Sequence, residues 1–162
     1  MRRQERVEPG PGQESVWDYP RPPRVERSNR RIEVVLDGEV LAETSASLRV
    51  LETGHAPAYF VPPREVRLDL LTPSRRPATY CEFKGEAIYY DAAGRVGVAW
   101  SYPSPSPGYE ALTDHVAFFP GKVDRATVDG EVVQVQTADV YGGWVTVDVV
   151  GPFEGVLDTQ GR

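Results

Sequence analysis

A glutamate and a histidine stand three residues apart around a glycine, in the stretch Leu-Glu-Thr-Gly-His at residues 51–55. In a turn, the carboxylate of Glu52 could orient or charge the imidazole of His55, and such a pair makes a general base near neutral pH. The simpler alternative is that His55 caps or bridges its own turn, because a lone histidine usually has a structural partner. The pair is a candidate acid–base site.

Three further residues could assist such a site. Tyr59 could donate a hydrogen bond to an oxyanion or a ligand carbonyl, or it could pack as an aromatic residue on a sheet. Cys81 could be a nucleophile if His55 or Lys84 lowered its pKa. On a predicted strand, however, a free cysteine is also a typical inert core residue. Lys84 stands at a predicted hairpin turn, where it could contact a ligand carboxylate or simply be solvated.

Two aromatic residues alternate with a serine in the stretch Ala-Trp-Ser-Tyr-Pro at residues 99–103. On a strand this spacing puts Trp100 and Tyr102 on the same face. With Pro103 they could form the wall of an apolar pocket for a flat ligand. Packing in the core is the alternative for both aromatic side chains.

Short strands must position these residues. Apolar residues alternate at Ile32, Val34 and Leu36, and the pattern has the period of a strand. Asp-Gly pairs at 37–38 and 129–130, and Lys-Gly at 84–85, indicate hairpin turns. The apolar spacing over 62–71 and over 110–119 predicts two short helices. The sequence therefore predicts a mainly β fold: a small curled antiparallel sheet or a partly open barrel, with one or two short helices.

The composition divides the chain into three parts. Residues 1–16 are rich in Pro and Gly without an apolar pattern, so we expect a disordered arm. Residues 17–150 are expected to form a single β domain. Within it, the aromatic residues Trp17 and Tyr19 should hold the N-terminal arm against the body of the domain. Residues 151–162 are expected to be a C-terminal tail.

Charge and cysteine content exclude several classes of function. The chain has 162 residues and a net charge of −6, and its first 31 residues hold eight arginines and five acids, so the rest is strongly acidic. An acidic body argues against a nucleic-acid groove, and no apolar run is long enough for a membrane span. One cysteine makes neither an internal disulfide nor a multi-cysteine zinc site, and no tight spacing supports a metal at His55 and His115. Because no signal peptide is evident, we expect a cytoplasmic protein. Since no motif for a metal or cofactor is found, we also expect that the protein uses neither.

Three segments together carry a family resemblance: 51–55, Cys-Glu-Phe-Lys-Gly at 81–85, and 99–103. With Tyr59, Pro62 and residues 64–71 between them, their order and spacing resemble the bacterial family catalogued as domain of unknown function 427, over about residues 31–130. The resemblance implies a small, mainly antiparallel β structure related to tent-like β folds, with no established activity. A nucleotidyltransferase label attached to that family implies a Gly-Ser turn followed by two acids one residue apart, which hold Mg²⁺. Here 68–70 reads Leu-Asp-Leu, with one acid and no such turn.

Three functions follow as hypotheses. The first is a small-molecule-binding module whose pocket is lined by His55, Tyr59, Lys84, Trp100 and Tyr102. The second is an enzyme that uses Glu52 and His55 as acid and base, with Cys81 or Tyr59 assisting. The third is a structural or interaction protein that forms a homodimer through a sheet edge.

Overall fold

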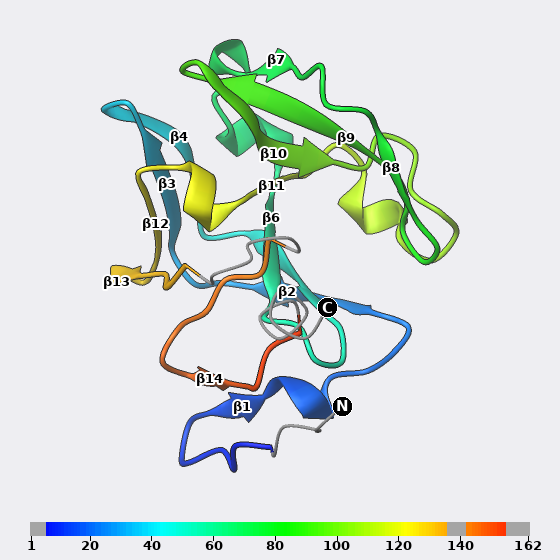
Figure 1. Cartoon of the computed structure of the whole chain (residues 1–162), viewed down its shortest axis with the longest axis vertical. Coiled ribbons are helices and arrows are strands. Elements are labelled where there is room, and N and C mark those ends of the chain that lie inside the picture. Colours follow the sequence, from blue (N-terminus) through cyan, green and yellow to red (C-terminus); the bar gives the residue numbers. More distant parts are fainter. Residues whose placement is uncertain (1–5, 136–141, 155–162) are drawn as a thin grey trace, which may run out of the picture.

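The structure is a computed structural model that describes residues 6–135 and 142–154, and its regular secondary structure is mostly β-strand (Figure 1). The strands are β1 Glu14–Ser15, β2 Arg24–Ser28, β3 Ile32–Leu36, β4 Glu39–Thr44, β5 Ser47–Leu51, β6 Ala58–Val61, β7 Thr72–Pro73, β8 Thr79–Cys81, β9 Gly85–Ala92, β10 Arg95–Ser101, β11 Val116–Phe118, β12 Arg125–Val128, β13 Glu131–Val132 and β14 Val149–Val150. Five single turns of 3-10 helix join them: η1 Val16–Asp18, η2 Pro63–Glu65, η3 Leu68–Leu70, η4 Glu110–Leu112 and η5 Pro120–Lys122. The mainly β prediction is confirmed.

The strands form one long sheet, one shorter sheet and a two-stranded pair. The long sheet runs β2-β5-β6-β11-β10-β9-β7, with β8 added to β9, and the short sheet runs β13-β12-β3-β4. All strand pairs within both are antiparallel, and both sheets have free ends, so neither closes into a barrel. β1 and β14 pair in parallel and bring the two ends of the described chain together (Figure 1).

Both predicted Asp-Gly hairpins are present and lie side by side in the short sheet. Asp37 and Gly38 have φ of 54° and 77°, and Asp129 and Gly130 have φ of 49° and 83°. Positive φ at both central residues is the requirement of this tight turn, and Asp and Gly tolerate it best. β3 of the first hairpin pairs with β12 of the second, so the two similar segments form one continuous four-stranded layer.

The two predicted helices are replaced by single 3-10 turns. In the first region η2 and η3 are separate turns, and Leu68 is exposed rather than buried on an apolar stripe. In the second region η4 ends at Leu112, Asp114 takes a φ of 59°, and the chain continues as β11. Leu112, Val116 and Phe119 have helical spacing, but that spacing arises here from a turn followed by a strand.

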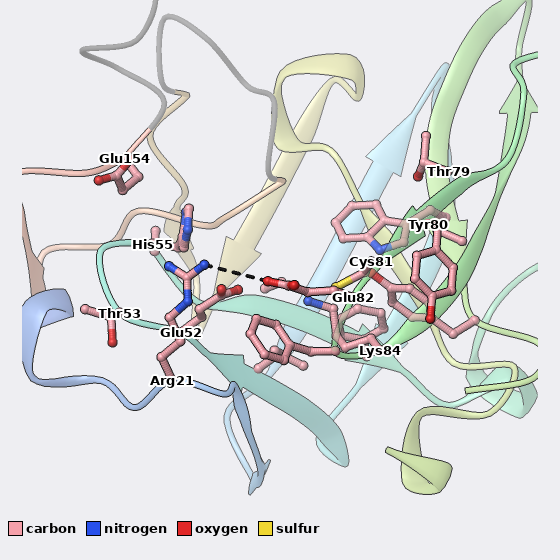
Figure 2. Close-up of a pocket in the computed structure, with 18 of the residues that line it drawn as sticks. Arg21, Glu52, Thr53, His55, Thr79, Tyr80, Cys81, Glu82, Lys84 and Glu154 are labelled. Carbon is pink, nitrogen blue, oxygen red and sulfur yellow. Dashed lines mark ion pairs between the residues drawn. The ribbon is translucent and has the colours of Figure 1, made fainter. Parts of the chain in front are cut away.

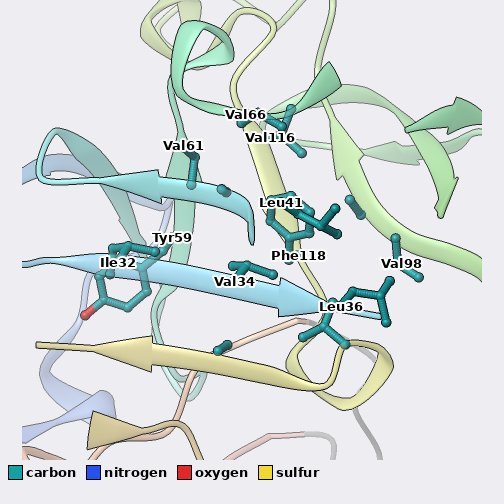
Figure 3. Close-up of a cluster of buried hydrophobic side chains, with 14 of the residues drawn as sticks. Ile32, Val34, Leu36, Leu41, Tyr59, Val61, Val66, Val98, Val116 and Phe118 are labelled. Atoms are coloured by element: carbon teal, nitrogen blue, oxygen red, sulfur yellow. The ribbon is translucent and has the colours of Figure 1, made fainter. Parts of the chain in front are cut away.

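The long sheet has two differently filled faces because side chains alternate along its strands. One face packs against the short sheet and forms the main core, in which Tyr59 and Phe118 lie among aliphatic residues (Figure 3). The other face carries a second, aromatic-rich cluster that includes Phe60, Trp100 and Phe119. This second face is the floor of the site described below.

Residues 14–16, which the composition assigned to a disordered arm, are part of the folded structure. Val16 is fully buried in a third cluster with Leu51 and Val149. The indole N–H of Trp17 donates to the carbonyl of Pro152 at 2.7 Å, so the N-terminal arm packs on the body of its own chain. Most of the expected C-terminal tail, residues 155–162, lies outside the described residues. Over the part of the chain that the structure describes, none of the helical segments has the length and apolarity that a membrane crossing requires.

Candidate functional site

A cavity of about 610 Å³ opens on the second face of the long sheet. Two walls and an aromatic floor enclose it (Figure 2). The loop wall is the turn that follows β5, together with segments near both ends of the described chain; the hairpin wall is β8 with its turn into β9 (Figures 1 and 2). The lining residues are Trp17, Arg21, Val50, Glu52, Thr53, His55, Ala56, Ala58, Phe60, Thr79, Tyr80, Cys81, Glu82, Phe83, Lys84, Ala87, Tyr89, Trp100, Tyr102, Phe119 and Glu154.

The loop wall is fixed by hydrogen bonds around Gly54. The amide of His55 donates to the carbonyl of Glu52 at 3.0 Å and closes the turn. The amide of Gly54 donates to the carbonyl of Val16 at 2.9 Å, and its own carbonyl accepts from the amide of Glu154 at 2.7 Å. Gly54 has a φ of +85°, and a Cβ there would lie 2.8 Å from Cγ of Glu154, so only glycine fits. The turn is thus held between two segments that are far apart in sequence.

The hairpin wall faces the loop wall across the opening. β8 pairs with β9 in the register Thr79 with Ala87 and Cys81 with Gly85, so Thr79 and Cys81 lie on the same face and line the cavity. The guanidinium of Arg21 lies 4.0 Å from the carboxylate of Glu82 and 5.7 Å from the ring centre of Phe83. This contact spans from the N-terminal arm to the hairpin, as the dashed line in Figure 2 shows.

The floor consists of aromatic rings in contact with one another. Trp100 and Phe119 have ring centres 4.5 Å apart, and Phe60 lies 5.7 Å from Trp100 and 5.9 Å from Tyr102. Ala58 and Phe60 of β6 alternate onto this face, as Trp100 and Tyr102 do from β10 and the residue that follows it. Lys84 reaches over the floor, with its ammonium nitrogen 5.9 Å from the ring centre of Tyr102.

Burial sets the protonation of the two most enclosed titratable groups. Burial lowers the pKa of His55 below its ordinary value, although the nearby carboxylates of Glu52 and Glu154 act in the opposite direction. His55 is therefore neutral at pH 7. Burial also raises the pKa of the Tyr102 hydroxyl, which stays protonated as a hydrogen-bond donor and acceptor.

Six of the seven residues singled out from the sequence line this one cavity: Glu52, His55, Cys81, Lys84, Trp100 and Tyr102. They come from three distant segments, which converge on the same face of the sheet. Cys81 is half-buried in the cavity lining, so the sealed-core alternative does not describe it.

Tyr59 is the residue that the fold places elsewhere. It is 1% exposed and lies in the main core (Figure 3). Its ring centre is 5.2 Å from that of Trp144. Its neighbours Ala58 and Phe60 face the cavity, so the alternation of β6 turns Tyr59 to the opposite face of the sheet. Burial raises the pKa of its hydroxyl, which therefore stays protonated at neutral pH.

The two histidines do not form a common site. His115 lies immediately before β11, with its Nδ1 at 3.1 Å from the carbonyl of Thr113, and it lines a different cavity from His55. Within residues 6–135 and 142–154 no group of three His, Cys, Asp or Glu side chains is arranged to hold a metal ion.

Sequence reasoning missed several lining residues from the chain ends and the floor. Trp17, Arg21 and Glu154 complete the loop wall, while Phe60 and Phe119 belong to the floor. The two aromatic residues of the N-terminal arm were a signal that this arm packs on the body, but not that it reaches a site. Glu154 left no signal, because its place depends on pairing between distant parts of the chain.

This arrangement suits a flat molecule with polar edges. The aromatic floor offers stacking area, and the walls offer a neutral imidazole, a thiol and charges of both signs. The neutral imidazole beside Glu52 could also accept a proton from a bound molecule.

A family model described as "Domain of unknown function (DUF427)" matches residues 24–129. No curated protein matches the chain. The matched range contains most of the floor and the hairpin wall, whereas Trp17, Arg21 and Glu154 lie outside it.

Proposed function

The chain belongs to the family described as a domain of unknown function (DUF427), and we propose that this member is a binding module for a small, flat, polar-aromatic or carbonyl-bearing molecule. The observation that carries the proposal is the convergence of Trp100, Tyr102 and His55 on one cavity. A floor of packed rings with a few polar groups around it is the usual composition of a small-molecule site.

The polar groups favour a ligand with a carbonyl, amide or carboxylate edge. Lys84 supplies a positive charge above the floor, and Arg21 supplies another at the rim. The neutral imidazole of His55 can donate to a carbonyl or accept from an amide. The acids Glu52, Glu82 and Glu154 outnumber the cations Arg21 and Lys84, so the lining carries a slight net negative charge and a polyanionic ligand is disfavoured.

The proposal can be tested with three simple probes: benzamide, benzoate and indole. We expect benzamide or benzoate to shift the NMR signals of Trp100 and His55 in the full chain. Trp100→Leu should weaken that binding about tenfold, because it removes the largest ring of the floor. Tyr90→Phe is the matched control: it removes a hydroxyl that bonds Ser101 at 2.8 Å, away from the cavity lining, and should leave probe affinity unchanged.

Lys84→Gln provides a second test, at a turn position where the side chain can change without altering the strand pairing of the hairpin. It should weaken benzoate binding while sparing benzamide, since only benzoate carries a charge for the lysine. If none of the three probes shifts signals of the cavity, or if Trp100→Leu folds and binds unchanged, the binding proposal is wrong.

An enzyme is the second candidate, and the state of His55 favours it. A neutral histidine beside Glu52, with Cys81 also lining the cavity, has the composition of an acid–base site with a thiol at hand. Tyr59 takes no part in this candidate because it faces the main core. The enzyme hypothesis requires that His55→Gln abolish turnover of a bound carbonyl compound while leaving its affinity within about threefold.

A further inference from the structure

A second cavity, of about 940 Å³, lies where the chain crosses between the two sheets. β2 ends, β5 begins, β6 ends and β11 begins at this place, because these neighbouring strands alternate in direction (Figure 1). The lining residues are Glu14, Glu26, Arg27, Ser28, Asn29, Arg30, Ser45, Ala46, Ser47, Leu48, Arg49, Pro62, Arg64, Ala111, His115 and Asp148. In contrast to the first cavity, the imidazole of His115 is the one aromatic ring among the described residues of this lining.

The carboxylates of this lining are already engaged by two of its arginines. Arg49 is buried, and its guanidinium binds both oxygens of Glu14, at 2.9 and 3.0 Å, and one oxygen of Glu26, at 2.6 and 3.0 Å. Arg30 binds the carboxylate of Asp148 at 2.7 Å and also that of Asp129 at 3.0 Å. These ion pairs neutralise the negative charge of the lining.

Two cations of the lining have no counter-charge among the described residues. Arg27 and Arg64 are exposed, and neither has an ion pair with any residue that the structure describes. They approach the cavity from different elements, β2 and η2, so an anion between them would be met from two directions. An arginine fork is well suited to the paired oxygens of a phosphate or carboxylate.

A buried hydroxyl provides an independent indication of a ligand. Ser47 is 1% exposed and lines the same cavity, and its Oγ has no hydrogen-bond partner among the described residues. A buried polar atom without a partner is costly, and natural structures contain few of them. An oxyanion that enters the cavity would accept a hydrogen bond from this hydroxyl.

We propose that this second cavity binds a compact oxyanion, the phosphate or carboxylate group of a small molecule, through Arg27, Arg64 and Ser47. The charges of the lining support an anion rather than a cation, since each carboxylate among its described residues has an arginine partner and two arginines are left over. This site is separate from the aromatic cavity, so its existence does not depend on the ligand proposed there.

Inorganic phosphate and acetate are the probes, each titrated into the full chain by calorimetry against chloride at equal ionic strength. We expect phosphate to bind and to raise the unfolding temperature. The double variant Arg27→Gln, Arg64→Gln should weaken binding about tenfold or more. Arg75→Gln is the matched control, because Arg75 is exposed and lines neither cavity; it should bind phosphate like the unmodified chain.

Ser47→Ala gives a second readout in which stability and binding move in opposite directions. Without ligand, the variant should be as stable as the parent or more stable, because the unpaired hydroxyl is gone. Its affinity for phosphate should nevertheless fall severalfold. Binding of acetate but not phosphate would assign the site to carboxylates. No binding of either probe at millimolar concentration, or equal binding by the double variant, would overturn the proposal.

Discussion

The two cavities lie toward opposite ends of the same three strands, β2, β5 and β6, yet they have different chemistry. The first is floored by aromatic side chains that alternate onto one face of the long sheet. The second is lined by polar residues at the connections between the sheets. Strand faces and strand ends are therefore chemically independent: alternation decides which side chains cover a face, whereas the connections at the strand ends can carry charged residues.

The cavities also differ in which part of the chain closes them. The loop wall of the first cavity includes Trp17, Arg21 and Glu154, which all lie outside the family-matched range 24–129. The unpaired cations of the second, Arg27 and Arg64, lie inside that range. Family members with other flanks should therefore differ most at the aromatic cavity.

Arg49→Met should have the largest effect on stability, and it alters the arginine-rich second cavity. It leaves the carboxylates of Glu14 and Glu26 without their arginine partner, which should reduce the free energy of unfolding by about 3 kcal/mol, the low end for a buried pair because both carboxylates are partly solvated. Urea denaturation at pH 7 measures this loss. Arg24→Met is the control, since its 3.5 Å contact with Glu26 is largely exposed and should cost less than about 1 kcal/mol. Similar losses in both variants would show that burial of Arg49 contributes nothing special.

Gly142→Ala should have the next largest effect on stability, and it acts on Trp100 in the floor of the aromatic cavity. A Cβ at this position would lie 2.3 Å from the ring of Trp100, and the residue has a φ of +66°. Together the clash and the backbone strain should cost about 2–4 kcal/mol and displace the indole.

Gly94→Ala separates those two causes. Gly94 has a φ of +76°, but a Cβ added there would have no atom within 4 Å, so this variant suffers the backbone strain alone, about 1–2 kcal/mol. Denaturation curves of both variants and tryptophan fluorescence measure the difference. Equal losses and unchanged fluorescence would mean that Trp100 moves aside at no cost.

His55→Gln should alter the pH dependence of stability. Since burial holds the pKa of His55 below its ordinary value, the unfolded chain takes up a proton there before the folded chain does. The stability that neutral His55 contributes is therefore fully present above the pKa of the unfolded chain, about 6.5. It is lost as the pH falls from that value through the lower pKa of the folded state. We expect the parent to lose more stability than the variant between about pH 7.5 and about pH 5.5, measured by urea denaturation. An NMR titration that gives His55 an unshifted or raised pKa would contradict this.

Arg21→Gln should have the smallest effect on stability. Its contact with Glu82 is 4.0 Å long and exposed at both side chains, so the loss should be below about 0.5 kcal/mol. Because the contact joins the two walls of the aromatic cavity, we expect the hairpin wall to become more mobile, with faster amide exchange at residues 82–84. Unchanged exchange with unchanged stability would remove any role for the contact in holding the walls.

Local signals predicted the parts of the fold that local chemistry decides. The Asp-Gly turns require positive φ at two adjacent residues, so they were visible in the sequence and are present at 37–38 and 129–130. The helix expected over 110–119 was wrong because apolar residues four apart also arise when a turn, broken at Asp114, runs into a strand. Spacing alone does not separate these two cases.

In the aromatic cavity, too, local sequence predicts some residues and long-range pairing decides the others. Its three segments carry side chains capable of chemistry or stacking beside Gly or Pro, and six of the seven residues that the sequence singles out line the cavity. Tyr59 could not be placed, because β6 reads Ala-Tyr-Phe-Val and is apolar on both faces, so periodicity does not tell which face meets the cavity. The end segments depend on pairing between residues far apart in sequence, such as Glu14 and Val149, and no local pattern encodes that pairing.

The parallel pairing of β1 with β14 also fixes an order of assembly. Val16 is covered by Val149, and the turn around Gly54 is bonded on one side to Val16 and on the other to Glu154. During synthesis β1 is made first but cannot pair until β14 is made near the other end of the chain. By then all strands of the two antiparallel sheets have been made. A nascent chain that stopped before residue 149 would hold most of the core and an open aromatic face, so the loop wall of the aromatic cavity is complete only once β14 and Glu154 have been made.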